Sequence, residues 1–126
     1  MFANVSVMGL PLLEFDHRLK TNRWIVKRPI YLFADEKSMS AHTEMRSDLA
    51  SIPKLIRTLF PIDGRHVRAA ILHDAMYRWY SPFNRAEADW LFYTMMMQDG
   101  VPRWRAELMY QGVRAGGWMT WNRYHK

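Results

Sequence analysis

Four side chains that can exchange protons or bind metal ions lie close together in the sequence: His73, Asp74, Tyr77 and Asp89. His73 and Tyr77 share one face if their segment is helical, while Asp74 points about 100° away from His73 around the helix axis. A carboxylate hydrogen-bonded to one imidazole nitrogen fixes the tautomer of the ring and raises its basicity. With Asp89 across from it and Tyr77 beside it, His73 is therefore expected to act as a general base on water.

Asp74 is expected to bind a hard cation, such as calcium, through its carboxylate oxygens. Asp48 is expected to complete the metal site from the hinge segment Ser47-Asp48-Leu49-Ala50-Ser51-Ile52-Pro53. The alternative interpretation is that this cluster is structural. A histidine on an apolar helix is often a hydrogen-bonded core residue. Asp89 then only pairs with Arg85 of its own helix or bonds a loop amide.

The elements that must position these residues divide the chain into two parts. The first part is rich in β-branched and aromatic residues, which favour strands. It predicts strands over residues 23–27 and 29–33, a turn over residues 34–37, and a further strand within residues 38–46. These strands are expected to form a small antiparallel sheet.

The second part predicts helices, because apolar residues recur at helical spacing between clear breakers. The predicted helices span residues 53–59, 65–79, 85–98 and 103–115. Asn84 suits the cap before the third of them, and Asp99-Gly100 ends it. The short loop before Asn84 makes the second and third helices antiparallel neighbours, which brings Asp89 towards His73.

The fold class that follows is α+β, with a small N-terminal antiparallel sheet followed by a cluster of about four helices. Residues 1–126 form a single domain in this prediction: residues 1–46 mostly β, residues 53–116 mostly helical, and residues 117–126 an aromatic tail. The expected buried stripes of the second and third helices are Val67, Ala70, Ile71 and Met76, and Ala88, Leu91, Phe92, Met95 and Met96.

The composition narrows the functional classes. No cysteine is present, which excludes disulfides and thiolate metal sites, and no apolar run is long enough to span a bilayer or reads as a signal peptide. The net charge of +6 favours anionic partners such as lipid headgroups, nucleic acid or an acidic protein. The basic residues are scattered, however, and no zinc-ligand spacing or basic run occurs, so nucleic-acid binding is disfavoured.

Several stretches carry a resemblance to a known family. They are residues 47–53 (the hinge), 70–77, 85–89, and the span from 100–104 to 117–118. In the hinge the family favours Thr-Asp-x-Ala-Ser-x-Pro, and this chain has Ser47 in place of the threonine. On these residues the chain resembles the phage-encoded domain of unknown function numbered 1353. The resemblance implies a bacteriophage or prophage origin, a location in the host bacterial cytoplasm or the virion, and no established activity.

A second resemblance concerns chemistry. The pattern His73-Asp74-Ala75-Met76-Tyr77, followed by Asp89, is similar to the core of the phospholipase A2 families. This likeness implies that His73 is the base, that Asp74 binds calcium, and that Tyr77 and Asp89 support the histidine. The chain departs from the pattern because it lacks the glycine-rich calcium loop and the cysteines of the secreted members.

Two functional hypotheses follow. In the first, the protein is a metal-assisted ester hydrolase whose basic surface suits anionic lipid, with Trp118 and Trp121 suited to a membrane interface. In the second, it is a non-enzymatic tail, capsid or host-interaction protein in which the His-Asp cluster is structural. The 10 methionines and 6 tryptophans of the chain suit such an interface.

Overall fold

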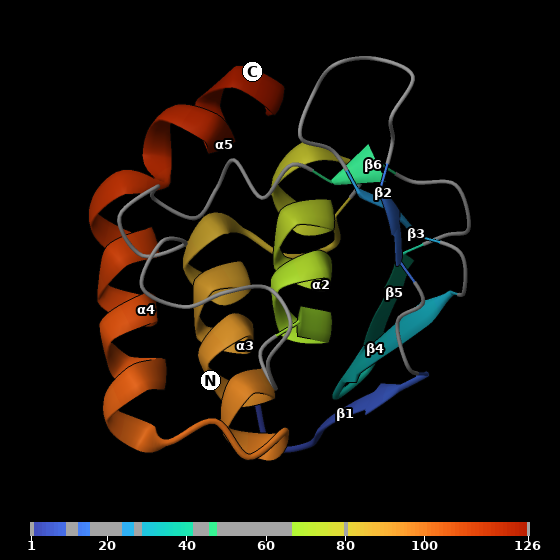
Figure 1. The fold of residues 1–126 in the computed structure, drawn as a ribbon, viewed down its shortest axis with the longest axis vertical. Coiled ribbons are helices and arrows are strands. Elements are labelled where there is room, and N and C mark those ends of the chain that lie inside the picture. The colour runs from blue at the N-terminus through green and yellow to red at the C-terminus, as the bar shows by residue number, and fades with distance from the viewer. Residues whose placement is uncertain are drawn as a thin grey trace.

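The computed structural model describes residues 2–9, 13–15, 24–26, 29–41, 46–47, 67–79 and 81–125. In this part of the chain, all strands precede all helices, and the fold is α+β as predicted (Figure 1). The strands are β1 (Val5–Met8), β2 (Leu13–Phe15), β3 (Trp24–Val26), β4 (Ile30–Ala34), β5 (Lys37–Ala41) and β6 (Arg46–Ser47). The helices are α2 (Val67–Arg78), α3 (Arg85–Gln98), α4 (Arg103–Gly116) and α5 (Trp118–Tyr124).

The described strands form two antiparallel three-stranded sheets, with the orders β1-β4-β5 and β2-β3-β6. The expected strands at residues 23–27 and 29–33 correspond to β3 and β4, which belong to different sheets. Strands β1 and β2 were not expected, because segments of four and three residues are too short to show a clear period-two pattern. They are strands because β1 pairs with β4 and β2 pairs with β3.

Strand β4 faces the core with alternate residues. Ile30, Leu32 and Ala34 are buried, while Tyr31 and Phe33 are exposed, as the pleat of a half-buried strand requires. The predicted turn after β4 is confirmed: Asp35, with a φ of 53°, and Glu36 connect β4 to β5. This hairpin presents the buried face of β4 to the helices.

The helices lie on one side of the strands in Figure 1, with α2 nearest to the strands and α4 farthest away. Helix α3 has the predicted bounds because local signals define both ends. Asn84 and Glu87 form a reciprocal capping box, and Gly100 takes a positive φ of 85° after the last turn. The predicted stripe of α3 is confirmed, since Ala88, Leu91, Phe92, Met95 and Met96 are all buried.

The C-terminal segment corrects a prediction. Residues 117–126 were expected to be an aromatic tail after a helix stop at Gly116-Gly117, but residues 118–124 form α5. Gly117 takes a right-handed helical conformation; its N–H bonds to Val113 O at 2.9 Å, and Trp121 N–H bonds to Gly117 O at 3.1 Å. Helical hydrogen bonding therefore passes through the glycine, and α5 packs against α2 and α4.

Other expectations fall partly outside the described residues. The predicted helix over residues 53–59 and most of the hinge, including Asp48, lie there. The further strand expected within residues 38–46 overlaps both β5 and β6. No helix in the described ranges is long and apolar enough to cross a bilayer.

Candidate functional site

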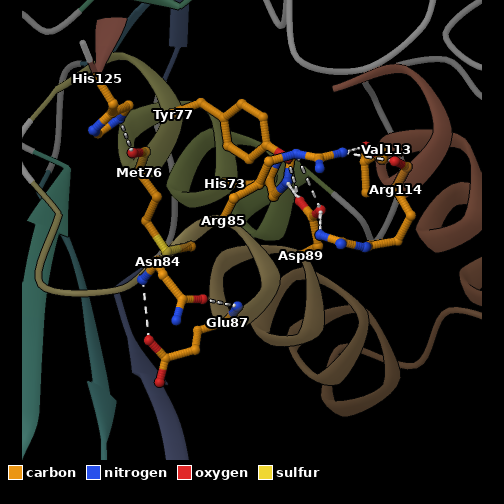
Figure 2. A network of polar contacts seen from close by, with 10 residues as sticks. All are labelled: His73, Met76, Tyr77, Asn84, Arg85, Glu87, Asp89, Val113, Arg114 and His125. Carbon is orange, nitrogen blue, oxygen red and sulfur yellow. Dashed lines mark hydrogen bonds and ion pairs between the residues drawn. The ribbon is translucent and has the colours of Figure 1, made fainter. Parts of the chain in front are cut away.

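The antiparallel pair α2 and α3 brings His73 and Asp89 together. His73 Nε2 lies 2.7 Å from Asp89 Oδ1, and the hydroxyl of Tyr77 donates to the same oxygen at 2.6 Å (Figure 2). His73 and Tyr77 lie one helical turn apart, and their ring centroids are 4.4 Å apart. The spatial grouping of these three predicted site residues is therefore what the sequence spacing suggested.

Two arginines that were not predicted as site residues complete the network. Arg114 on α4 donates from Nη1 to Asp89 Oδ2 at 2.7 Å, while Arg85 Nε lies 4.0 Å from that oxygen. Arg85 Nε also donates to the Tyr77 hydroxyl at 3.2 Å (Figure 2). Arg85 carries a local signal, since it precedes Asp89 by four residues on α3, but Arg114 lies 25 residues away from Asp89 and has no such signal.

Arg85 also joins the network to the end of α4. Its Nη2 atom donates to the carbonyl oxygens of Val113 and Arg114, at 3.1 and 2.6 Å. These carbonyls belong to the last turn of α4, where the helix dipole favours a cation. Val113 O also accepts from the N–H of Gly117. One guanidinium therefore links Tyr77 on α2 with the C-terminal end of α4.

The electrostatics assign a charge state to Asp89. Burial by itself raises the pKa of a carboxyl group, but the hydrogen bonds from His73, Tyr77 and Arg114 together hold the pKa of Asp89 below its ordinary value. The hydrogen bond to Asp89 raises the pKa of Arg114. Asp89 is therefore a buried carboxylate, and the charge of a neighbouring arginine compensates it.

Tyr77 is the neutral donor of the site. Burial raises the pKa of its phenol far above the ordinary value, and the negative charge of Asp89 raises it further. The hydroxyl consequently keeps its proton and donates to Asp89 while accepting from Arg85. Tyr77 thus supports the carboxylate and is not itself poised to ionise.

Aromatic and helical packing encloses the network. The His73 ring stacks on Phe92 with a centroid distance of 4.5 Å, and Trp121 packs edge-on against Tyr77 at 5.1 Å. His73, Tyr77 and Asp89 each have 0% of their surface exposed. The low dielectric of such an environment strengthens the hydrogen bonds and makes any missing partner costly.

The two predicted metal ligands are placed differently. Asp74 follows His73 on α2 and is buried, with 1% exposed, whereas Asp48 lies outside the described residues. Across the part of the chain that is described, no group of three or more His, Asp or Glu side chains is arranged to hold a metal ion. A calcium site built from Asp74 and Asp48 therefore stays a prediction.

The arrangement has a definite chemical capability. The carboxylate of Asp89 lies within hydrogen-bond distance of His73 Nε2, and such a contact favours the tautomer that has its proton on that nitrogen. A carboxylate that holds an imidazole in one tautomer is the geometry required of a general base. The same geometry also meets the hydrogen-bonding requirement of a histidine that is buried in a protein core without any catalytic role.

The comparisons with known proteins point to one family. A family model described as a protein of unknown function, DUF1353, matches residues 24–113. No curated protein and no solved structure matches the chain. The matched range includes His73, Tyr77, Asp89 and α2 and α3 in full. Because the model covers well over half of the chain, this protein belongs to the DUF1353 family.

Proposed function

We propose that this protein is an ester hydrolase in which His73 is the general base that activates water. One observation carries the proposal: the 2.7 Å contact between His73 Nε2 and Asp89 Oδ1, supported on the same oxygen by Tyr77. It supports the proposal because a carboxylate bonded to one imidazole nitrogen orients the ring and raises its basicity. The likeness to phospholipase A2 directs the choice of substrate towards esters of anionic phospholipids.

The proposal assigns Asp74 as the first ligand of a calcium ion, with Asp48 as the second. Carboxylate oxygen is the donor that calcium prefers, and calcium bound near an ester polarises its carbonyl group. The described residues hold no complete group of metal ligands, so the role of His73 is assigned without the ion. Calorimetric titration of the wild type and of Asp74→Asn with calcium tests the assignment. A heat of calcium binding that is the same in the two proteins contradicts it.

The catalytic assignment is tested by comparing the wild type with His73→Gln. The glutamine amide can still donate to Asp89 but cannot act as a base at neutral pH. Hydrolysis is measured on vesicles of phosphatidylglycerol in the presence of calcium, and folding is measured by thermal unfolding. We expect the variant to lose turnover by about 100-fold or more while it stays folded. Equal turnover in the two proteins would exclude His73 as the base.

A second candidate function is favoured by a different observation. His73, Tyr77 and Asp89 are completely buried, and both oxygens of Asp89 accept hydrogen bonds. In this candidate the cluster is structural, and the protein is a non-enzymatic phage tail, capsid or host-interaction component. It predicts no hydrolysis by the wild type and a large loss of stability in His73→Ala. The phage origin is a proposal that rests on the family resemblance, and mass spectrometry of purified particles tests incorporation into the virion.

A further inference from the structure

A hollow lies on the surface between α3 and α4 and has no part in the His73 network. Its volume is about 630 Å³, within the range of about 300–1,000 Å³ that small-molecule sites occupy. The lining residues are Trp90, Tyr93, Arg103, Trp104, Glu107, Leu108, Tyr110 and Gln111. The two helices lie side by side in Figure 1, so residues from both form the walls.

The walls of the hollow are aromatic. The ring centroids of Trp90, Tyr93 and Tyr110 lie 5.5, 5.7 and 6.1 Å from one another, so the three rings support each other in fixed orientations. Trp104 stands beside them on α4 and is 62% exposed, while Leu108, one turn later, is 42% exposed. Large apolar side chains held open to solvent around one concavity mark a binding site more often than a core.

The polar groups of the hollow balance in charge. Arg103 Nε donates to Glu107 Oε1 at 3.0 Å, and these are the charged residues of the lining. The two opposite charges cancel, so the lining has no net charge that would attract an ion from a distance. Gln111 and the tyrosine hydroxyls add neutral donors and acceptors. The electrostatics therefore favour a neutral ligand with many hydrogen-bonding groups.

We infer that this hollow binds a neutral oligosaccharide. A pyranose ring has a face of C–H groups, whose slight positive charge complements the negative face of an indole or phenol ring. Its edge carries hydroxyl groups, which suit the carboxylate, guanidinium and amide groups of Glu107, Arg103 and Gln111. The stacking surfaces come from Trp104 and from the cluster of Trp90, Tyr93 and Tyr110, and the polar side chains of α4 supply the hydrogen bonds. The Arg105 guanidinium lies over the Trp104 ring, 5.5 Å from its centroid, so a sugar would stack on the opposite face of that indole.

This site has no residue in common with the proposed hydrolase site. His73 faces α3 from α2, whereas the oligosaccharide site lies between α3 and α4 and shares none of the residues of the His73 network. The inference therefore adds a recognition function that holds whether or not His73 catalyses a reaction.

The test is saturation-transfer NMR on the full chain with maltotriose, cellotriose and chitotriose, and with choline as a cationic comparison ligand. Inorganic phosphate, which has no C–H protons, is the anionic comparison ligand and is followed by its phosphorus NMR shift. At least one trisaccharide should receive transfer on its ring C–H protons, and its affinity should fall about ten-fold in Trp104→Ala. Trp118→Ala is the matched control, because Trp118 is 51% exposed on α5 and does not line the hollow. Its affinity should equal that of the wild type.

Three results would overturn the inference. The first is no transfer to any of the three sugars. The second is sugar binding that Trp104→Ala leaves unchanged or that Trp118→Ala weakens equally. The third is transfer to choline or a phosphate shift without sugar binding, which would mean that a charged ligand, not a neutral one, fits the hollow. Because Trp104 is exposed, Trp104→Ala is expected to fold, and thermal unfolding of the variant checks this.

Discussion

A Cβ atom on Gly117 would lie 2.8 Å from the hydroxyl oxygen of Tyr77. The same atom would lie 3.1 Å from Tyr77 Cε2, so the ring cannot avoid it by a small movement of the hydroxyl. It would also lie 2.6 Å from the backbone oxygen of Val113. Gly117 lies between α4 and α5, and Tyr77 lies on α2. The absence of a side chain at position 117 thus allows the C-terminal helices to close over the His73–Tyr77–Asp89 network.

Gly117→Ala is expected to destabilise the fold. Overpacking of this kind costs about 1–3 kcal/mol, which exceeds the gain of about 0.5–1 kcal/mol that alanine brings to a helix. Urea unfolding measures the change. Combining the substitution with Tyr77→Phe, which removes the contacting oxygen, should cost less than the sum of the two single changes. A stabilised Gly117→Ala protein would contradict the close approach.

Tyr77→Phe alone is expected to lower the free energy of unfolding by about 1–3 kcal/mol, because Asp89 loses a buried donor. The raised pKa of Tyr77 also predicts a dependence on alkaline pH. Above about pH 10 the unfolded chain releases this proton while the folded chain keeps it, so stability is complete below that pH and falls above it. The free energy of unfolding, measured with a chemical denaturant across this pH range, should fall less at alkaline pH in Tyr77→Phe than in Tyr124→Phe. Tyr124→Phe is the matched change at an exposed tyrosine.

Asp89→Asn is expected to destabilise the protein by about 3 kcal/mol, because it removes the buried charge that His73 and Arg114 share. The lowered pKa of Asp89 predicts an effect in acid. Above about pH 4 its contribution to stability is complete; as the pH falls further, the unfolded chain takes up the proton first and stability is lost. The wild type should therefore lose more stability than Asp89→Asn on acidification. Parallel curves for the two proteins would argue against an ionised Asp89.

Arg114→Met and Arg103→Met should behave differently. Arg114 pairs with a carboxylate that is fully buried, and its loss is expected to cost about 1–3 kcal/mol. Arg103 pairs with Glu107 at the surface, where the two side chains are 75% and 50% exposed, and its loss should change stability little. Thermal unfolding of both variants makes the comparison. Equal falls in the two melting temperatures would show that Arg114 does not compensate the charge of Asp89.

Local signals account for the parts of the structure that were predicted well. The bounds of α3 follow from the capping box at Asn84 and the stop at Asp99-Gly100, because backbone hydrogen bonds at helix ends are satisfied within a few residues. The shared face of His73 and Tyr77 follows from helical geometry. The loop of few residues between α2 and α3 then makes these helices antiparallel, and Asp89 meets His73.

Other features had no local signal. The sequence of Gly116-Gly117 reads as a helix stop, yet α5 continues because it packs on α2 and α4. The short strand β1 exists because Val5–Met8 pairs with β4, and the partners are distant in the chain. Packing energy between distant segments overrides weak local preferences in both cases.

Local sequence signals account for the α+β order of elements, the bounds of α3, and the proximity of His73, Tyr77 and Asp89, because each depends on hydrogen bonds and spacing over a short stretch of chain. The packing of the helices is needed to explain why Arg114 neutralises Asp89, why Gly117 accommodates Tyr77, and why Trp90 and Trp104 line one hollow. These contacts join residues on different helices. Their distances depend on how the helices pack, and no periodicity within one segment encodes that packing.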